Sequence, residues 1–311
     1  MRHGIFALLF LLLNLSALAQ DSTYTAEDIK INQFVDGTLV VPNSAERPPL
    51  VIMIQGSGPT DRDGNQSFMK NNSLKKLSQG LAAEGIASFR FDKRILKMSQ
   101  NQIKEEEMRF DDFVTDVNSI IAHFDNSRLF GKTIILGHSQ GSLIGMLAGK
   151  EKADAFISIA GAAQSIDSII IDQIALQMPS LKENVEQTFT ELRQTGSSQN
   201  YNSVLESIFR PSVQPFILSW MQYNPKEEIA NLNMPVLLIN GNKDLQVMPS
   251  EAEALKAAYP EAELVILDKM NHVLRKIEGS ELENSKSYNE PNLPLHPELI
   301  PTITEFIKNL K

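Results

Sequence analysis

Cysteine is absent from this chain of 311 residues. The absence excludes disulfide bonds, a thiol nucleophile and a lipid anchor attached to cysteine. The fold must therefore rest on its hydrophobic core alone. For an exported protein, the lack of cysteine favours a bacterial periplasm or a secreted fraction.

Basic residues are in the minority. Lysine and arginine number 29 against 38 aspartates and glutamates, so the formal net charge is −9. This balance, with no basic run in the sequence, argues against nucleic acid or an anionic membrane as the main partner. Hydrophobic residues make up 42% of the chain and charged residues 22%, which is ordinary for a globular protein.

The apolar run at residues 5–13 is too short to span a bilayer. A positively charged start precedes it, and Ala17-Leu18-Ala19 has the Ala-x-Ala form of a cleavage site. The pattern predicts a signal peptide over residues 1–19 and export to the periplasm or the medium. An uncleaved membrane anchor is the alternative. After cleavage we expect no stable membrane insertion.

Past residue 20, short apolar runs alternate with amphipathic helical stretches. We predict an N-terminal antiparallel strand or hairpin at 34–41. Buried strands are predicted at 50–54, 86–91, 133–136, 155–160, 236–239 and 264–267, and helices at 73–84, 110–124, 142–148, 250–259 and 300–310. Repeated units of this kind predict an α/β fold, with a mostly parallel sheet and helices on both faces.

Residues 164–233 break this alternation, because they contain helical stretches and no clear strand. So long a segment exceeds a normal crossover between strands. We predict an inserted helical cap over the active site, between a first part of the core at 20–163 and a second part at 234–311. Ordinary helices packed on the sheet are the alternative. The aromatic and methionine residues of the segment could line an apolar substrate pocket or form the cap's own core.

Residues 137–141 read Gly-His-Ser-Gln-Gly and lie between a predicted strand and a predicted helix. Gly-x-Ser-x-Gly in the order strand, turn, helix is the nucleophile elbow of serine hydrolases. It places the hydroxyl of Ser139 on a tight, strained turn, and the glycines let the strand and the helix approach closely. Five residues in this pattern also occur by chance, but the flanking elements favour Ser139 as a nucleophile.

A serine hydroxyl needs a general base, and the chain has five histidines. His272 follows the last predicted strand, at the carboxyl edge where the elbow also lies, and we predict that it is the base. His3 leaves with the signal peptide, and the side chain of His138 should point away from its neighbour Ser139. His123 lies on a predicted helix upstream of the serine, and His296 precedes Pro297 at the start of the last predicted helix.

The base needs an acidic partner that fixes its tautomer and stabilises the imidazolium. Asp244 follows the strand at 236–239, again at the carboxyl edge, and we predict this role for it. Asp268 is the rival, but it directly precedes the histidine loop and is better explained as a loop-capping residue.

Acyl transfer also needs donors for the developing oxyanion. We predict the backbone N–H of Gln140 as one donor, because it follows the nucleophile at the start of a helix. The second is expected from the glycine-rich loop 55–59, with the N–H of Ser57 as the best candidate. Gly56 or Gly58 would shift the register by one residue.

With Ser139, Asp244 and His272 in this chain order, the sequence resembles the α/β-hydrolase fold family. Residues 56–65, Gly-Ser-Gly-Pro-Thr-Asp-Arg-Asp-Gly-Asn, look like a loop of bacterial secreted serine esterases, a group related to prolyl-oligopeptidase-like and serine-aminopeptidase-like hydrolases. Phe-Asp-Lys-Arg at 91–94 is similar to a Tyr-Asp-Lys-Arg-Gly segment of that group, although Ile95 replaces its glycine. The resemblance implies an eight-stranded type of sheet, a helical cap, a covalent acyl-enzyme and no cofactor.

Charged residues cluster at 61–63 and 92–94, after neighbouring strands. We interpret them as a salt-bridge network that orders the oxyanion loop. In the alternative interpretation, Arg62 or Arg94 binds a substrate carboxylate. No histidine or carboxylate set has the spacing of metal ligands, so no metal site is expected.

These patterns together predict a serine carboxylesterase that acts on small-molecule esters of small or medium acyl groups. A peptidase or amidase of the serine-aminopeptidase type is an alternative. It is less favoured because residues 164–233 show no clear acidic pair that would bind the amino terminus of a substrate. A non-catalytic binding protein on the same fold is another, and the intact set of nucleophile, base and acid argues against it. The patterns specify no oligomeric state, acyl length or alcohol.

Overall fold

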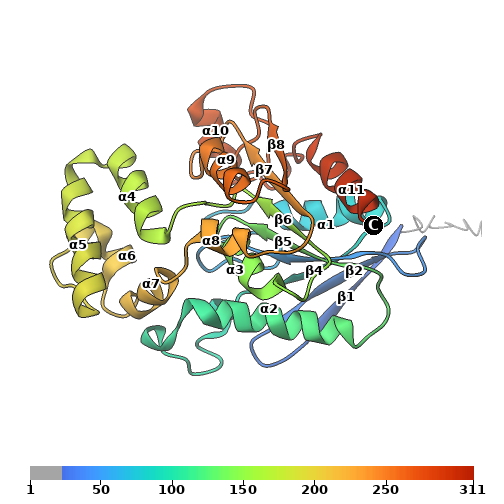
Figure 1. The fold of residues 1–311 in the computed structure, drawn as a ribbon, viewed down its shortest axis with the longest axis horizontal. Coiled ribbons are helices and arrows are strands. Elements are labelled where there is room, and N and C mark those ends of the chain that lie inside the picture. The colour runs from blue at the N-terminus through green and yellow to red at the C-terminus, as the bar shows by residue number, and fades with distance from the viewer. Residues whose placement is uncertain (1–22) are drawn as a thin grey trace, which may run out of the picture.

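The computed structural model describes residues 23–311 (Figure 1). The predicted signal peptide at 1–19 lies outside the described residues and stays a prediction. None of the helices in the described part of the chain combines the length and the apolar character that crossing a membrane requires.

One eight-stranded sheet forms the centre of the molecule, in the order β1-β2-β4-β3-β5-β6-β7-β8. The strands are β1 (Tyr24–Lys30), β2 (Asp36–Pro42), β3 (Leu50–Ile54), β4 (Ala87–Phe91), β5 (Thr133–His138), β6 (Ala155–Ile159), β7 (Val236–Gly241) and β8 (Glu263–Leu267). The six neighbouring strands β4, β3, β5, β6, β7 and β8 run parallel, while β2 is antiparallel to both of its neighbours, β1 and β4. The predicted parallel strands are therefore present. The sequence analysis missed β1, because its residues are mostly exposed and give no apolar signal.

Helices cover both faces of the sheet (Figure 1). They include α1 (Ser73–Ala83) and α11 (Leu299–Asn309) on one face, and α2 (Phe110–Asp125), α3 (Gln140–Gly149) and α9 (Pro249–Ala258) on the other. Every residue of β3 is buried. Ile52 packs in the cluster with α2 and α3, and its neighbour Val51 packs in the cluster with α1 and α11. Successive side chains of a strand point to opposite faces, so a continuous apolar run serves two cores.

Short elements complete the fold outside these layers. The helix α10 (Glu281–Ser287) was not predicted. Single 3-10 turns are η1 (Arg94–Lys97), η2 (Glu105–Glu107), η3 (Pro179–Leu181) and η4 (Ser203–Leu205). Ile95 lies in η1; it stands where the Tyr-Asp-Lys-Arg-Gly segment of the similar esterases has its glycine.

The order in which the chain adds strands to the sheet changes direction at β3: β4 lies on one side of it, and β5 and the later strands lie on the other. Ile54 at the end of β3 pairs with Gly137 of β5. The chain leaves β3 toward α1 and leaves β5 into α3, which cover opposite faces. Such a switch point leaves a crevice at the carboxyl ends of the strands.

A helical segment joins β6 to β7. Its helices are α4 (Ile166–Gln177), α5 (Lys182–Thr195), α6 (Glu206–Phe209), α7 (Gln214–Trp220) and α8 (Pro225–Ala230). In Figure 1, α4 to α7 lie to one side of the sheet, and they bury a cluster of their own that includes Val185, Leu192 and Phe209. In contrast, α8 packs against α3 and α9. The segment is helical as predicted, and it rejoins the core through α8.

We predict that Gly141→Ala destabilises the protein more than Gly85→Ala. A Cβ at Gly141 would lie 2.4 Å from the carbonyl oxygen of Ile54. It would force β3 and α3 apart, at a cost of about 3 kcal/mol. Gly85 has φ +81° with nothing within 4 Å of an added Cβ, so its substitution costs only the left-handed strain of about 1 kcal/mol. Urea unfolding measures both losses, and equal losses would contradict the steric explanation.

Candidate active site

Ser139 lies on the turn between β5 and α3. Its backbone has φ 54° and ψ −120°, a conformation that is strained for a residue with a side chain. The N–H of Ser139 donates to the carbonyl oxygen of Ile159 at 2.9 Å, which fixes the turn to β6. The predicted strand, turn and helix are all present, and Ser139 lines two cavities.

His272 and Asp244 are hydrogen-bonded to each other. His272 Nδ1 lies 2.8 Å from Asp244 Oδ2, and both side chains are buried. The other carboxylate oxygen accepts the backbone N–H groups of Gln246 at 2.8 Å and Val247 at 2.9 Å. Burial alone would raise the pKa of Asp244, but the imidazole of His272 and these backbone donors outweigh it and lower the pKa. An ionised Asp244 accepts a proton-bearing Nδ1, which leaves Nε2 of His272 as the basic nitrogen.

The predicted nucleophile and the predicted base meet in one place. Ser139 and His272 both line a small cavity of about 70 Å³ at the carboxyl edge of the sheet. Ser139, Asp244 and His272 follow the ends of β5, β7 and β8, and more than a hundred positions of the sequence separate the first of these strands from the other two. The structure thus brings together the three residue types that activate a serine hydroxyl.

The rival residues have other contacts. The Asp268 carboxylate accepts the side-chain amide of Asn242 at 2.9 Å in an exposed position, as expected of a loop residue. His296 is buried, with Nε2 2.9 Å from the carbonyl oxygen of Asp268. His123 is exposed on α2, where its ring packs edge-on against Phe124.

His138 contacts the predicted base, His272, through a hydrogen bond and a ring contact. Its Nε2 lies 2.9 Å from the carbonyl oxygen of His272, and the two ring centroids are 4.8 Å apart. A carbonyl only accepts, so Nε2 of His138 carries the proton. Burial, followed by repulsion from His272, lowers the pKa of His138 to about 4. The sequence analysis predicted only that the side chain of His138 points away from Ser139. Its hydrogen-bond partner, His272, follows β8, and no local sequence pattern indicates this contact.

The loop after β3 lies over the elbow. A Cβ added at Gly56 would be 3.3 Å from both the Cβ of Ser139 and the Nδ1 of His138. The carbonyl oxygen of Ser57 accepts the side-chain N–H of Gln66 at 2.9 Å and the hydroxyl of Thr60 at 3.1 Å. These bonds hold the loop in a fixed position next to Ser139.

Ser57 and Gln140, the predicted oxyanion donors, line the same larger cavity as Ser139. No acceptor within residues 23–311 takes the backbone N–H of Ser57. Gln140 is the first residue of α3, where a backbone N–H has no acceptor inside the helix. Two free N–H groups on either side of a serine can bind a developing negative charge.

Arg62 and Arg94 are both engaged in ion pairs. Arg62 pairs with Asp92 at 2.7 Å, Asp36 at 2.5 Å and Asp28 at 3.0 Å. Arg94 pairs with Asp116 at 2.6 Å and with Asp112 at 2.9 Å. Neither arginine lines the two cavities at Ser139. These contacts agree with the interpretation of a network that orders the loops.

Lys93, between the two clusters of ion pairs, has a different environment. Its Nζ donates to the carbonyl oxygen of Gly56 and to the side-chain oxygen of Gln140, both at 2.6 Å. The side chain is buried and lines the larger cavity. Burial lowers the pKa of Lys93 to about 7. The sequence analysis named Lys93 only as one member of a charged cluster, because the neighbours that matter come from two other strands.

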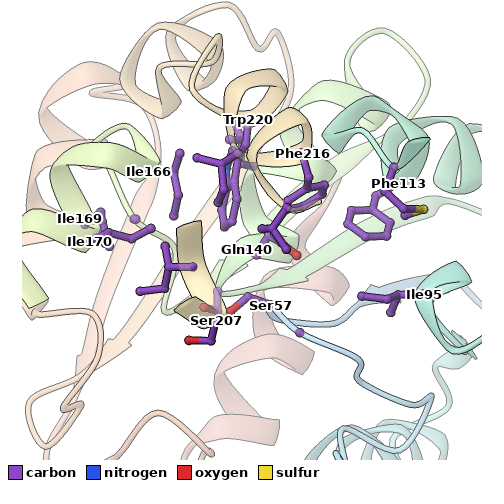
Figure 2. Close-up of a pocket in the computed structure, with 18 of the residues that line it drawn as sticks. Ser57, Ile95, Phe113, Gln140, Ile166, Ile169, Ile170, Ser207, Phe216 and Trp220 are labelled. Carbon is purple, nitrogen blue, oxygen red and sulfur yellow. The ribbon is translucent and has the colours of Figure 1, made fainter. Parts of the chain in front are cut away.

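The larger cavity has a volume of about 460 Å³ and lies between the sheet edge and the helical segment. Figure 2 shows Ile166, Ile169 and Ile170 of α4 on one side, with Phe216 and Trp220 of α7 above Ser57 and Gln140. Both alternatives for the segment's aromatic residues therefore apply. Phe216 and Trp220 line the cavity, whereas Phe189 and Phe209 are buried within the segment.

Comparison with known proteins gives a consistent family. A family model described as serine aminopeptidase, S33, matches residues 70–276. A curated relative, esterase EstD of Thermotoga maritima, is 27% identical over 274 residues, which are 83% of this chain and 62% of the relative. This chain therefore spans less than two thirds of the length of that relative.

Solved structures share the fold. Est1E from Butyrivibrio proteoclasticus with bound ferulic acid matches with a TM-score of 0.60 and 17% identity, over 92% of this chain and 99% of that one. The acylaminoacyl peptidase of Pyrococcus horikoshii matches with a TM-score of 0.57 and 16% identity, over 93% of this chain and 42% of that one. The fold class predicted from the sequence is confirmed.

We predict that His138 makes the protein less stable in mild acid. In the folded protein the pKa of His138 is about 4, and the ordinary value in an unfolded chain is about 6.5. Between these values the unfolded chain binds more protons, so the free energy of unfolding falls as the pH falls. His138→Gln, which keeps an N–H donor, should flatten this dependence in urea unfolding. The control His123→Gln should keep the original slope, and a steep slope in His138→Gln would contradict the prediction.

Proposed function

The chain belongs to the serine aminopeptidase S33 family of α/β-hydrolases, and we propose that it cleaves carboxylic esters of small or medium acyl groups. The observation that carries the proposal is the hydrogen bond of 2.8 Å between Asp244 and His272, with His272 and Ser139 lining one cavity. The likeness to esterase EstD supports ester chemistry within this family.

In the proposed reaction, Ser139 Oγ attacks the ester carbonyl carbon while His272 Nε2 takes its proton. Asp244 holds Nδ1 of His272 and stabilises the imidazolium that forms. The N–H groups of Ser57 and Gln140 bind the oxyanion of the tetrahedral intermediate. His272 then donates this proton to the alcohol oxygen, the bond between that oxygen and the acyl carbon breaks, and the alcohol departs. The acyl group stays bound to Ser139 Oγ. Water, activated by the same histidine, releases the acid.

The position of His272 distinguishes the acyl side from the alcohol side. The imidazole must reach the oxygen of the leaving alcohol to protonate it. His272 lines the small cavity and is not among the described residues that line the large one. We therefore place the alcohol in the small cavity and the acyl group in the large one.

The two cavities differ in size and in chemistry. The small one, of about 70 Å³, is lined in part by Thr60, Gln66 and Asn71. Since a water molecule occupies about 30 Å³ in the liquid, the cavity suits an alcohol the size of methanol or ethanol. The large one, of about 460 Å³, is mostly apolar and suits a medium acyl chain.

A peptidase that binds the amino terminus of its substrate is the second candidate, because the matching family model is described as serine aminopeptidase. Such an enzyme needs a free carboxylate near the nucleophile. Among the described residues, Glu105 is the one carboxylate that lines either cavity, and it is paired with Arg210, with Nε and Oε2 2.9 Å apart. This pairing favours an uncharged ester over a peptide with a free amino terminus.

We predict that Ser139→Ala lowers kcat/KM on an ethyl ester by roughly a thousandfold or more. A fluorophosphonate probe should label the parent protein and not the variant. Ser142→Ala is the matched control, because Ser142 lies in the first turn of α3 and its hydroxyl bonds to Ser158. Labelling that is equal in parent and Ser139→Ala, or absent in both, would contradict the proposal, and the second result would favour a binding protein.

A crossed panel of esters tests the two cavities. We expect kcat/KM to rise about two- to fourfold per added acyl methylene until the large cavity is full, and to fall when ethanol is replaced by a bulkier alcohol. Ile170→Trp should reduce the rate on long acyl chains and spare acetate esters. Met69→Ala should enlarge the small cavity and raise the rate on bulkier alcohols.

The opposite preference, for long alcohols over long acyl chains, would reverse the assignment of the cavities. Aminoacyl anilides belong in the same panel. Faster cleavage of these anilides than of the alkyl esters would support the peptidase instead.

A further inference from the structure

Lys93 is the second residue after β4, and its side chain contacts both segments that carry the predicted oxyanion donors. It is 2% exposed. Its ammonium contacts the Gly56 carbonyl and the Gln140 side chain, each at 2.6 Å, and lies 4.7 Å from the centre of the Phe113 ring. One cation therefore touches both segments that carry the predicted oxyanion donors.

Among residues 23–311, no carboxylate forms an ion pair with this cation. The charged groups on the surrounding elements are engaged with one another: Asp92 with Arg62, Asp112 and Asp116 with Arg94, and Glu105 with Arg210. The other titratable groups at the elbow are His138, His272 and Asp244, which bond among themselves. A buried charge without a counter-ion is costly. An apolar side chain of the same length would fill the space without that cost, so stability alone does not explain a lysine here.

The geometry of the peptide group explains what the lysine does. The carbonyl of Gly56 and the N–H of Ser57 belong to one planar trans peptide, so they point in opposite directions. By holding the carbonyl on its own side, Lys93 turns the Ser57 N–H to the other side. The same ammonium holds the side chain of Gln140, whose backbone N–H is the other predicted donor.

We propose that Lys93 is a positioning residue of the oxyanion hole, which aligns the Ser57 N–H and keeps a positive charge beside the site of the oxyanion. This inference rests on the proposed function. It also resolves the register of the loop, because a carbonyl held at Gly56 makes Ser57, and not Gly58, the donor that Lys93 orients.

The charge of Lys93 depends on pH near neutrality. Burial lowers the pKa of Lys93 to about 7, so the ammonium is charged below this pH and loses its proton above it. The neutral amine still has two N–H groups for its two acceptors, but the positive charge beside the oxyanion is gone. Turnover should therefore fall with rising pH to a lower plateau and not to zero.

Steady-state kinetics on an ethyl ester, from about pH 5.5 to about pH 9, test the proposal. In Lys93→Met we expect kcat to drop by roughly 10- to 100-fold with little change in KM, since losing one oxyanion donor outright costs about 10²- to 10³-fold. The alkaline decline of the parent protein, centred near pH 7, should vanish in this variant. Lys93→Arg should restore much of kcat and show no decline across this range, because a guanidinium stays charged.

The control is Lys152→Met, which removes an exposed lysine in the turn between α3 and β6 and should leave kcat and its pH profile unchanged. Circular dichroism establishes that each variant is folded; if Lys93→Met is not, the parent profile and Lys93→Arg carry the test. An alkaline decline that persists in Lys93→Arg, or a folded Lys93→Met with the parent's kcat and profile, would overturn the inference.

The proposed function fails separately. A parent protein that neither cleaves esters nor reacts with a fluorophosphonate contradicts that function. An active parent whose Lys93 variants behave like the parent contradicts only the role of Lys93.

Discussion

The pairing of β3 with β5 determines where every part of the site lies. Ile54 and Gly137 are partners in this ladder, and Gly141 at the start of α3 packs against the carbonyl of Ile54. The loop after β3 and the turn that carries Ser139 are therefore neighbours, although more than eighty residues separate them in the chain. β6, β7 and β8 add strands on one side and bring Asp244 and His272 to the same edge, while β4 on the other side delivers Lys93.

Most of the fold could be predicted from the sequence, because its strands are continuous apolar runs and its helices have regular periodicity. Ser139, Asp244 and His272 could be selected for a related reason: each follows a recognisable strand, and parallel strands end at one edge. The order of those strands has no local signature. The contact of His138 with His272 and that of Lys93 with Gly56 both depend on that order, so neither could be derived. β1 escaped because an exposed edge strand such as Tyr24–Lys30 lacks an apolar pattern.

Charge is distributed unevenly around the serine. Arg62 and Arg94 form ion pairs with five carboxylates between them and line neither cavity. Within the described part of the chain, the partners of Lys93 are two oxygen dipoles and an aromatic ring. The motif Asp-Lys-Arg at 92–94 thus combines two kinds of contact in consecutive residues. Asp92 and Arg94 fix the loops through ion pairs, and the lysine between them contacts the Gly56 carbonyl and the Gln140 side chain. A sequence comparison that treats this motif as one basic cluster would miss the division.

The helical segment α4 to α7 buries a hydrophobic cluster of its own, apart from the two that flank the sheet. A region with a separate core can open or unfold as a cooperative unit while the rest of the protein stays folded. Its sequence can also diverge with little effect on the strands that hold Ser139, Asp244 and His272. Under the proposed function, chemistry and acyl selectivity lie on different parts of one chain, so exchanging this segment would change the acyl preference while the residues at the sheet edge stay the same.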